Sequence, residues 1–154
     1  MQIAPPSREA VSFIIANMRD WDRREIFATR LDSDTGDGLL EDVFRAGPVA
    51  WVASHEGTPV AAFGCSPMWR GVWGMWMFAT DTFPKIGLGM TKFVIQGIIP
   101  MLWEHGAHRL ECKSMEGHVD AHRWLEVIGA RREATHPGYG RDGETFHTYV
   151  WEKS

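Results

Sequence analysis

The spacing of apolar residues predicts three helices in the first 46 residues. From Val11 to Met18 apolar residues recur at helical intervals, and Ser7 precedes them as a helix cap. A second helix is expected over Arg23–Leu31 behind Asp22, which has the capping-box spacing with Glu25, and a third over Leu39–Ala46, which ends at Gly47-Pro48. The apolar face of the second helix consists of Ile26, Phe27 and Leu31.

Short apolar runs then predict three consecutive antiparallel strands. Val49–Ser54 and Val60–Cys65 flank a short polar stretch that contains Gly57, which indicates a hairpin. Pro67–Gly71 is predicted to form the next turn, and it leads into the apolar run Val72–Ala79.

The stretch from Val72 to Gly106 predicts a strand, a glycine turn and a long helix. Gly87-Leu88-Gly89 opens the helix, and Pro100 is expected to kink it near its last turn. A strand that feeds a glycine turn and a helix N-terminus can bind phosphate, because backbone N–H groups and the helix dipole face the turn. The apolar face of this helix consists of Met90, Phe93, Val94, Ile98, Met101 and Leu102.

The last third of the chain predicts a strand, a helix and a hairpin. Arg109–Lys113 follows a strand and a helix, so we expect it to lie parallel to the Val72 strand through a right-handed crossover. A helix over Val119–Ile128 is expected to stop at Gly129, with Trp124, Leu125 and Ile128 inward. Arg131–Thr135 and Thr145–Glu152 then pair. Together the elements predict an α/β fold with a mixed sheet in one domain, residues 1–154.

Composition narrows the partners and the compartment. The formal net charge is -4 and no basic block occurs, so nucleic acid is not expected as the primary partner. No secretory signal pattern opens the sequence, and no apolar run approaches the ~20 residues of a membrane span. Cys65 and Cys112 fit two buried thiols of a reducing, cytoplasmic compartment, or else one disulfide.

The order of elements, the Gly87-Leu88-Gly89 turn and the sequence WLEVIGA (124–130) resemble the GNAT superfamily of acyl-CoA-dependent N-acetyltransferases. The resemblance covers nearly the whole chain. It is closest to small GNAT-like proteins of tailed phages, in the segments NMRDWDRREI (17–26) and HRWLEVIGA (122–130) and in the pair Thr80-Asp81. It implies a mostly antiparallel sheet with one parallel, splayed strand pair, flanked by about four helices.

The resemblance also implies a coenzyme A site. The backbone of Phe78, Ala79 and Thr80 would pair with the pantetheine arm like an added strand. The pyrophosphate would lie on the turn formed by Gly87, Leu88, Gly89 and Met90, with Lys85 as a nearby cation. The chain departs from the family pattern at three positions: Pro84 replaces the usual Arg or Gln, His118 replaces an asparagine, and Leu125 replaces a tyrosine that often protonates the leaving thiolate.

Acetyl transfer to an amine requires a base, and three residues are candidates: Asp81, Glu111 and His118. Each has a structural alternative. Asp81 could cap its turn, Glu111 could pair with Arg109 or Lys113, and His118 could cap the Val119 helix.

No metal is expected. His118 and His122 are four residues apart, but no third ligand has convincing spacing. The polar loop Leu31–Gly38 lacks the glycine and glutamate that a calcium loop requires at fixed positions.

The sequence therefore predicts an acetyl-CoA-dependent N-acetyltransferase that acts on an amine of a small molecule or a protein. The alternative is a GNAT-fold phage protein without catalysis, which acts in virion assembly or binds a host protein. A module that binds another nucleotide in the same cleft is a third hypothesis. Thr145–Trp151 has bulky residues on both faces, so a homodimer through this strand as a sheet edge is a further hypothesis.

Overall fold

The computed structural model describes residues 1–45 and 49–154. These residues contain seven strands in the order β1-β2-β3-β4-β5-β7-β6, with one parallel pair, β4 and β5, so the predicted α/β class with a mostly antiparallel sheet is confirmed. The chain divides into two compact units, residues 1–66 with 76–89 and residues 67–75 with 90–154. The single domain over 1–154 stays a prediction. The strands are β1 (Gln2–Ala4), β2 (Ala50–His55), β3 (Thr58–Trp69), β4 (Val72–Ala79), β5 (Arg109–Met115), β6 (Arg131–His136) and β7 (Phe146–Glu152).

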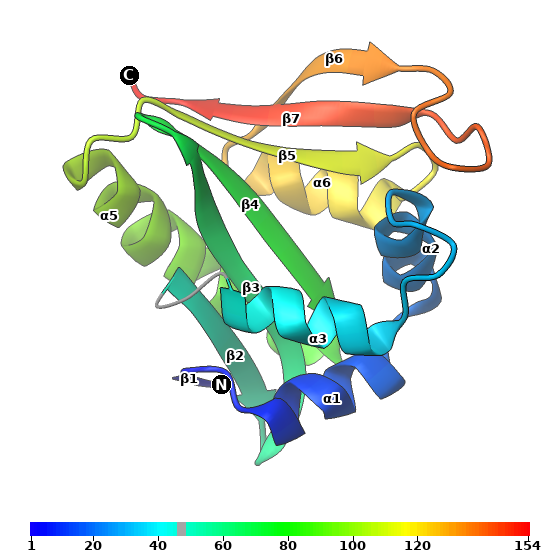
Figure 1. The fold of residues 1–154 in the computed structure, drawn as a ribbon. Coiled ribbons are helices and arrows are strands. Elements are labelled where there is room, and N and C mark those ends of the chain that lie inside the picture. The colour runs from blue at the N-terminus through cyan, green and yellow to red at the C-terminus, as the bar shows by residue number, and fades with distance from the viewer. Residues whose placement is uncertain (46–48) are drawn as a thin grey trace. The chain divides into compact units, whose positions relative to one another are not determined.

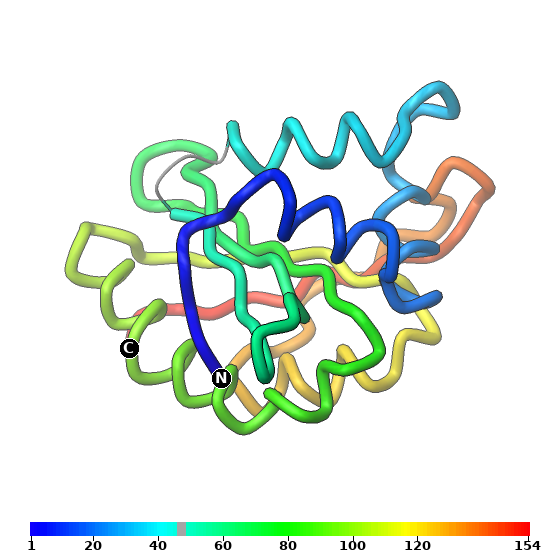
Figure 2. The backbone as a smooth tube through the Cα atoms, turned by 90° about the horizontal axis from the view of Figure 1, so that it is seen from below, coloured from blue at the N-terminus to red at the C-terminus, as the bar shows by residue number. Residues whose placement is uncertain are grey.

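In the first unit, helices α1 (Arg8–Ala16) and α3 (Gly36–Arg45) run beside one another (Figure 2). The Ser7 hydroxyl oxygen accepts a hydrogen bond from the Ala10 N–H at 3.1 Å, which confirms the predicted cap. Apolar residues of both helices meet β2, β3 and β4 in one cluster, so burial of these faces stabilises the unit. The cluster consists of Val11, Ile14, Met18, Leu39, Val43, Val52, Ala62 and Phe78.

The second helix differs from its prediction. α2 spans Asp20–Ala28, three residues earlier than expected, and Arg19 stands at its cap position without a side-chain cap bond. Asp22 lies inside the helix and is buried, so its predicted capping role is wrong. Ile26 and Phe27 pack against the core cluster as predicted, but the Leu31 side chain is 77% exposed.

The third helix and the first hairpin are also longer than predicted. α3 begins at Gly36 rather than Leu39, and its predicted stop at Gly47-Pro48 lies outside the described residues. The β2–β3 turn is only Glu56-Gly57, with φ of 49° and 81°, the left-handed pair that a tight hairpin turn requires. β3 runs on to Trp69, so the turn predicted over Pro67–Gly71 is wrong. The observed turn between β3 and β4 consists of Arg70 and Gly71.

β1 was not predicted, because three residues leave no periodic pattern to read. It pairs antiparallel with β2, with Gln2 opposite Ser54 and Ala4 opposite Val52. The pairing makes β1 one end of the strand order.

In the second unit, the predicted parallel pair is confirmed, with Val72 opposite Arg109 and Gly74 opposite Glu111. The predicted long helix consists of α4 (Gly87–Phe93), a π-helical segment (Val94–Ile98) and α5 (Ile99–Glu104). Pro100 has no N–H to donate to the carbonyl four residues earlier, and the widened π segment lies directly before it. The helix was expected to kink at Pro100, and the structure has a π-helical segment in the preceding turn.

β7 lies between β5 and β6, with α6 (Val119–Val127) over one face of these strands (Figure 1). The Trp151 indole N–H donates to the Ile128 carbonyl at 3.0 Å, and Gly129 ends the helix with a φ of 98°. Because β7 pairs on both sides, the prediction that it forms a sheet edge is wrong, and the homodimer stays a hypothesis without that basis. β6 is the outer strand, with a bulge at Glu133 between Arg132 and Ala134.

Candidate functional site

The segment that links β4 to α4 is a turn with backbone hydrogen bonds, and it belongs to the first unit up to Gly89. The Thr80 N–H donates to the Val60 carbonyl at 2.8 Å, and the Thr80 carbonyl accepts the Phe83 N–H at 3.1 Å. A 3₁₀ turn, Phe83–Lys85, follows and leads directly into the helix. The strand, turn and helix expected from the sequence are therefore present in that order.

The glycines at the start of α4 leave its backbone accessible. A Cβ atom added at Gly87 would meet nothing within 4 Å, and one at Gly89 would meet only the flexible Met1 side chain, at 3.0 Å from its Cε atom. The N–H groups of a first helical turn point out of the helix, where an anion can accept them. Leu88 is 73% exposed and Lys85 is exposed, whereas the Met90 side chain is fully buried. The Lys85 side chain is therefore open to solvent beside the turn, whereas Met90 offers only its backbone.

Phe78, Ala79 and Thr80 are all buried at the end of β4. The Phe78 ring stacks on Trp76 with centroids 6.0 Å apart and belongs to the core cluster. Because these side chains are buried, the predicted pairing with a coenzyme would involve only their backbone.

Arg19 and Asp22 contact this strand end, and sequence reasoning missed both. The Ala79 N–H donates to Asp22 Oδ2 at 2.8 Å, and the Arg19 N–H donates to the Ala79 carbonyl at 2.9 Å. The Arg19 guanidinium donates to both Asp22 oxygens at 2.8–3.1 Å and lies over the Phe83 ring at 4.9 Å. The sequence pattern that could have indicated this pair is an arginine and an aspartate three residues apart at the start of a helix.

Of the candidate bases, Asp81 lies in the first unit, exposed on the β4–α4 turn. In this turn the Thr80 hydroxyl oxygen accepts a hydrogen bond from the Thr82 N–H at 3.3 Å. Asp81 therefore presents its carboxylate to solvent beside the predicted coenzyme strand.

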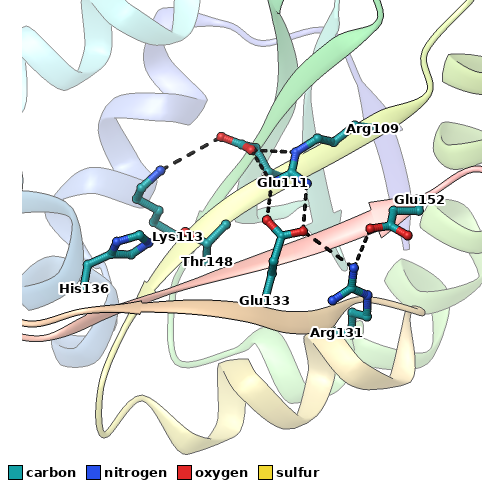
Figure 3. A network of polar contacts seen from close by, with 8 residues as sticks. All are labelled: Arg109, Glu111, Lys113, Arg131, Glu133, His136, Thr148 and Glu152. Carbon is teal, nitrogen blue, oxygen red and sulfur yellow. Dashed lines mark hydrogen bonds and ion pairs between the residues drawn. The ribbon is translucent and has the colours of Figure 1, made fainter.

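Glu111 belongs to a network of charged residues across β5, β6 and β7 (Figure 3). Arg109 donates to Glu111 at 3.0 Å and, through two nitrogens, to Glu133 at 2.6 and 2.9 Å. The hydrogen bond from Arg109 lowers the pKa of the Glu133 carboxyl, and the same bond raises the pKa of Arg109. Lys113 Nζ lies 4.0 Å from Glu111. The structural alternative for Glu111, pairing with Arg109 or Lys113, is thus present.

His118 lies at the cap position of α6, buried, and makes no side-chain cap bond, so its structural alternative is not observed. Glu111 lies within β5, and His118 follows the end of this strand, at the start of α6.

A second group that the sequence did not predict is a polar cluster of α6, β6 and β7, in which His122, His147 and Tyr149 are buried. The His122 and His147 rings meet edge to face at 5.7 Å, and His122 lies 5.3 Å from the Tyr149 ring. Arg132 of β6 donates to the Tyr149 hydroxyl at 2.9 Å, and the Thr135 hydroxyl is 2.9 Å from His147 Nδ1. Burial lowers the pKa of His147, and the positive charge of Arg132 and the neighbouring His136 lower it further, against a smaller opposing effect of Glu116.

Because of this cluster, we expect the free energy of unfolding to fall in mild acid. Because folding lowers the pKa of His147, the unfolded chain binds its proton more readily, and stability is lost as pH falls below about 6.5 toward the folded pKa. Each pKa unit of lowering corresponds to about 1.4 kcal/mol. Urea unfolding of His147→Gln between pH 7 and 5 is expected to show a flatter pH dependence than the parent. Equal slopes would contradict the assignment. The Glu133 contribution is lost at lower pH, below its ordinary value of 4.5, and does not overlap this window.

The Cys65 thiol is buried and is not a nucleophile at neutral pH. Burial raises the pKa of the Cys65 thiol to about 12, so the thiol stays protonated at neutral pH. Cys112 is partly buried, so the expectation of a buried thiol is confirmed for Cys65 only.

The whole chain is similar to solved acetyltransferase structures. It superposes on the ribosomal-protein-alanine N-acetyltransferase from Brucella melitensis with a TM-score of 0.74 and 16% identity, over 99% of this chain and 100% of that one. With Ard1 from Thermoplasma volcanium the values are 0.72 and 18%, over 99% and 97%. With the putative acetyltransferase yncA from Salmonella typhimurium, solved with its cofactor acetyl-CoA, they are 0.72 and 12%, over 98% and 92%.

The chain has the GNAT fold. An acetyltransferase from Streptococcus pneumoniae described as of the GNAT family also superposes over 99% of the chain, with a TM-score of 0.72 and 9% identity. No protein-family model matches the sequence, and no curated protein sequence matches it. At these identities the likeness shows the fold of the chain alone. No helix among the described residues is long and apolar enough to span a membrane.

Proposed function

We propose that this GNAT-fold protein is an acetyl-CoA-dependent N-acetyltransferase that acts on an amine of a small molecule or a protein. The observation that carries the proposal is the segment from Phe78 to Gly89, a strand that leads through a 3₁₀ turn into an accessible helix start. A protein of the same fold is solved with acetyl-CoA. The protein would act in the cytoplasm, or in the host cytoplasm if a phage encodes it.

Each part of the coenzyme has a matching group in this segment. The pyrophosphate would accept hydrogen bonds from N–H groups in the first turn of α4, such as those of Leu88 and Gly89, and the absence of a side chain at Gly87 lets it approach. Lys85 adds a positive charge next to this turn. The pantetheine amides would pair with the backbone at the end of β4 in the manner of an added strand.

The reaction joins an amine nitrogen to the acetyl carbon and breaks the carbon–sulfur bond of the thioester. A base removes a proton from the amine, and the coenzyme thiolate leaves and is protonated. Asp81, Glu111 and His118 remain the candidate bases. Glu111 carries ion pairs with Arg109 and Lys113, Asp81 is exposed, and His118 is buried.

The test is calorimetric titration of acetyl-CoA into the protein, followed by an assay of free thiol with a panel of amines. We expect saturable binding and amine-dependent release of coenzyme A. Among Asp81→Asn, Glu111→Gln and His118→Gln, the variant that lowers kcat by about 100-fold or more with unchanged coenzyme affinity identifies the base. Absence of binding at millimolar acetyl-CoA would overturn the proposal.

The alternative, a GNAT-fold phage protein without catalysis, has two observations in its favour. Leu125, where the resemblance expects a proton-donating tyrosine, is a buried core residue of α6. The backbone of Ala79 is already hydrogen-bonded within the chain. Such a protein would act in virion assembly or by binding a host protein. Coenzyme binding without thiol release from any amine would favour this alternative.

A further inference from the structure

The end of β4 is paired with the chain's own link between α1 and α2. Met18 forms an antiparallel bridge with Thr80. Arg19 and Asp22 hydrogen-bond both backbone groups of the neighbouring Ala79. Its carbonyl accepts the Arg19 N–H at 2.9 Å, and its N–H donates to Asp22 Oδ2 at 2.8 Å. These contacts resemble one step of strand pairing.

Charge holds this arrangement together. The Asp22 side chain is 3% exposed and the Arg19 side chain 21%, and three hydrogen bonds of 2.8–3.1 Å join them. Removing one member of a buried pair leaves the other uncompensated, so the pair is stable only as a unit. The Arg19 guanidinium also stacks on Phe83 of the 3₁₀ turn, which ties the link to the segment that leads into α4.

The same backbone groups are the ones that the coenzyme requires under the proposed function. A pantetheine arm offers amide N–H and C=O groups and would pair with a strand through one acceptor and one donor per residue. The single Ala79 N–H cannot donate well to both Asp22 and the arm. Either the arm avoids Ala79, or the link moves.

We propose that Arg19 and Asp22 form a latch on Ala79 that closes the coenzyme site in the free protein and is released when acetyl-CoA binds. The inference rests on the proposed function. A latched protein binds with an affinity reduced by the fraction of molecules that are open. Weakening the latch therefore tightens coenzyme binding, while a purely structural pair would, when broken, weaken it or leave it unchanged.

The first test compares acetyl-CoA titrations of the parent, Asp22→Ala and Asp20→Ala. Asp20 is an exposed carboxylate in the first turn of the same helix, so it controls for the loss of charge. We expect Asp22→Ala to bind at least about 10-fold more tightly, the equivalent of one hydrogen bond to a charged group, and Asp20→Ala to match the parent. Should Asp22→Ala not fold, Asp22→Asn replaces it, since it keeps the acceptor oxygen but loses the charge, with a smaller gain of the same sign.

The second test uses the parent protein and amide hydrogen exchange. Without coenzyme, the Arg19 and Ala79 amides are both expected to be protected. Saturating acetyl-CoA should expose the Arg19 amide, while the Ala79 amide stays protected by its new partner.

The outcomes separate the latch from the function. Parent binding with an unchanged Arg19 amide and equal affinity of the Asp22 variant would overturn the latch and leave the acetyltransferase proposal standing. No binding by either protein at millimolar acetyl-CoA would overturn both. Tighter binding by the variant, together with exposure of the Arg19 amide in the parent, would support both.

Discussion

A Gly87→Glu variant is expected to keep its fold and to lose acetyl-CoA binding by roughly 100-fold, or about 3 kcal/mol. The new side chain enters open space, since a Cβ atom at Gly87 would meet nothing within 4 Å. A carboxylate at a helix start is stabilising for the helix itself. The same carboxylate repels a pyrophosphate that approaches the turn. The melting temperature should therefore stay level or rise while the Kd for acetyl-CoA increases.

Gln96→Glu provides the matched control. It adds the same charge to an exposed position further along the same long helix, in its π-helical segment. We expect its affinity to equal that of the parent. Equal losses in both variants would indicate a general effect of net charge, and an unchanged Kd in Gly87→Glu would remove the glycine turn from the coenzyme site.

Phe78→Ala is expected to destabilise the protein by about 3–5 kcal/mol. The ring is 1% exposed, stacks on Trp76 and fills the cluster in which α1 and α3 meet the strands. Truncation leaves a cavity because the surrounding strands hold their positions by hydrogen bonds. The measurement is urea unfolding, with the midpoint and the slope determined separately.

Phe13→Ala serves as its control, because Phe13 is 40% exposed on α1. A surface truncation of this kind is expected to cost within about 0.5 kcal/mol. A small effect of Phe78→Ala, comparable to that of Phe13→Ala, would show that the cluster is not the core of the first unit.

The sequence predicts those elements whose apolar pattern is long or whose ends carry strong signals. β4 begins and ends where its apolar run does, and the Gly129 stop of α6 is correct because glycine alone tolerates that φ of 98°. β1 is too short to carry a pattern. α2 begins earlier than its capping pattern predicts, and Asp22 lies within it, bonded to Arg19 and to the N–H of Ala79, 57 residues away. Apolar runs and helix-end residues predict local structure, and a contact between distant parts of the chain can change it.

Some residues of the candidate site could be predicted from the sequence, and others could not. Gly87 and Gly89 could be chosen from their spacing, and the structure leaves the Gly87 backbone accessible. The Arg19–Asp22 pair could not be linked to Ala79, because nothing in the sequence marks which strand end accepts a helix start. Tyr149, Arg132 and the two buried histidines converge from α6, β6 and β7, and only the pairing of those strands brings them together.

β6, the outer strand of the second unit, has features that affect whether another molecule can pair with this edge of the sheet. β6 carries Arg131 and Glu133 in its first half, and the bulge at Glu133 interrupts the regular ladder there. A strand from another molecule that tried to extend the sheet would meet charged groups already engaged with Arg109 and Glu152, and an irregular hydrogen-bonding edge. Charged side chains and a bulge are features that disfavour edge-to-edge pairing, so we expect β6 to be a poor template for a strand of another molecule.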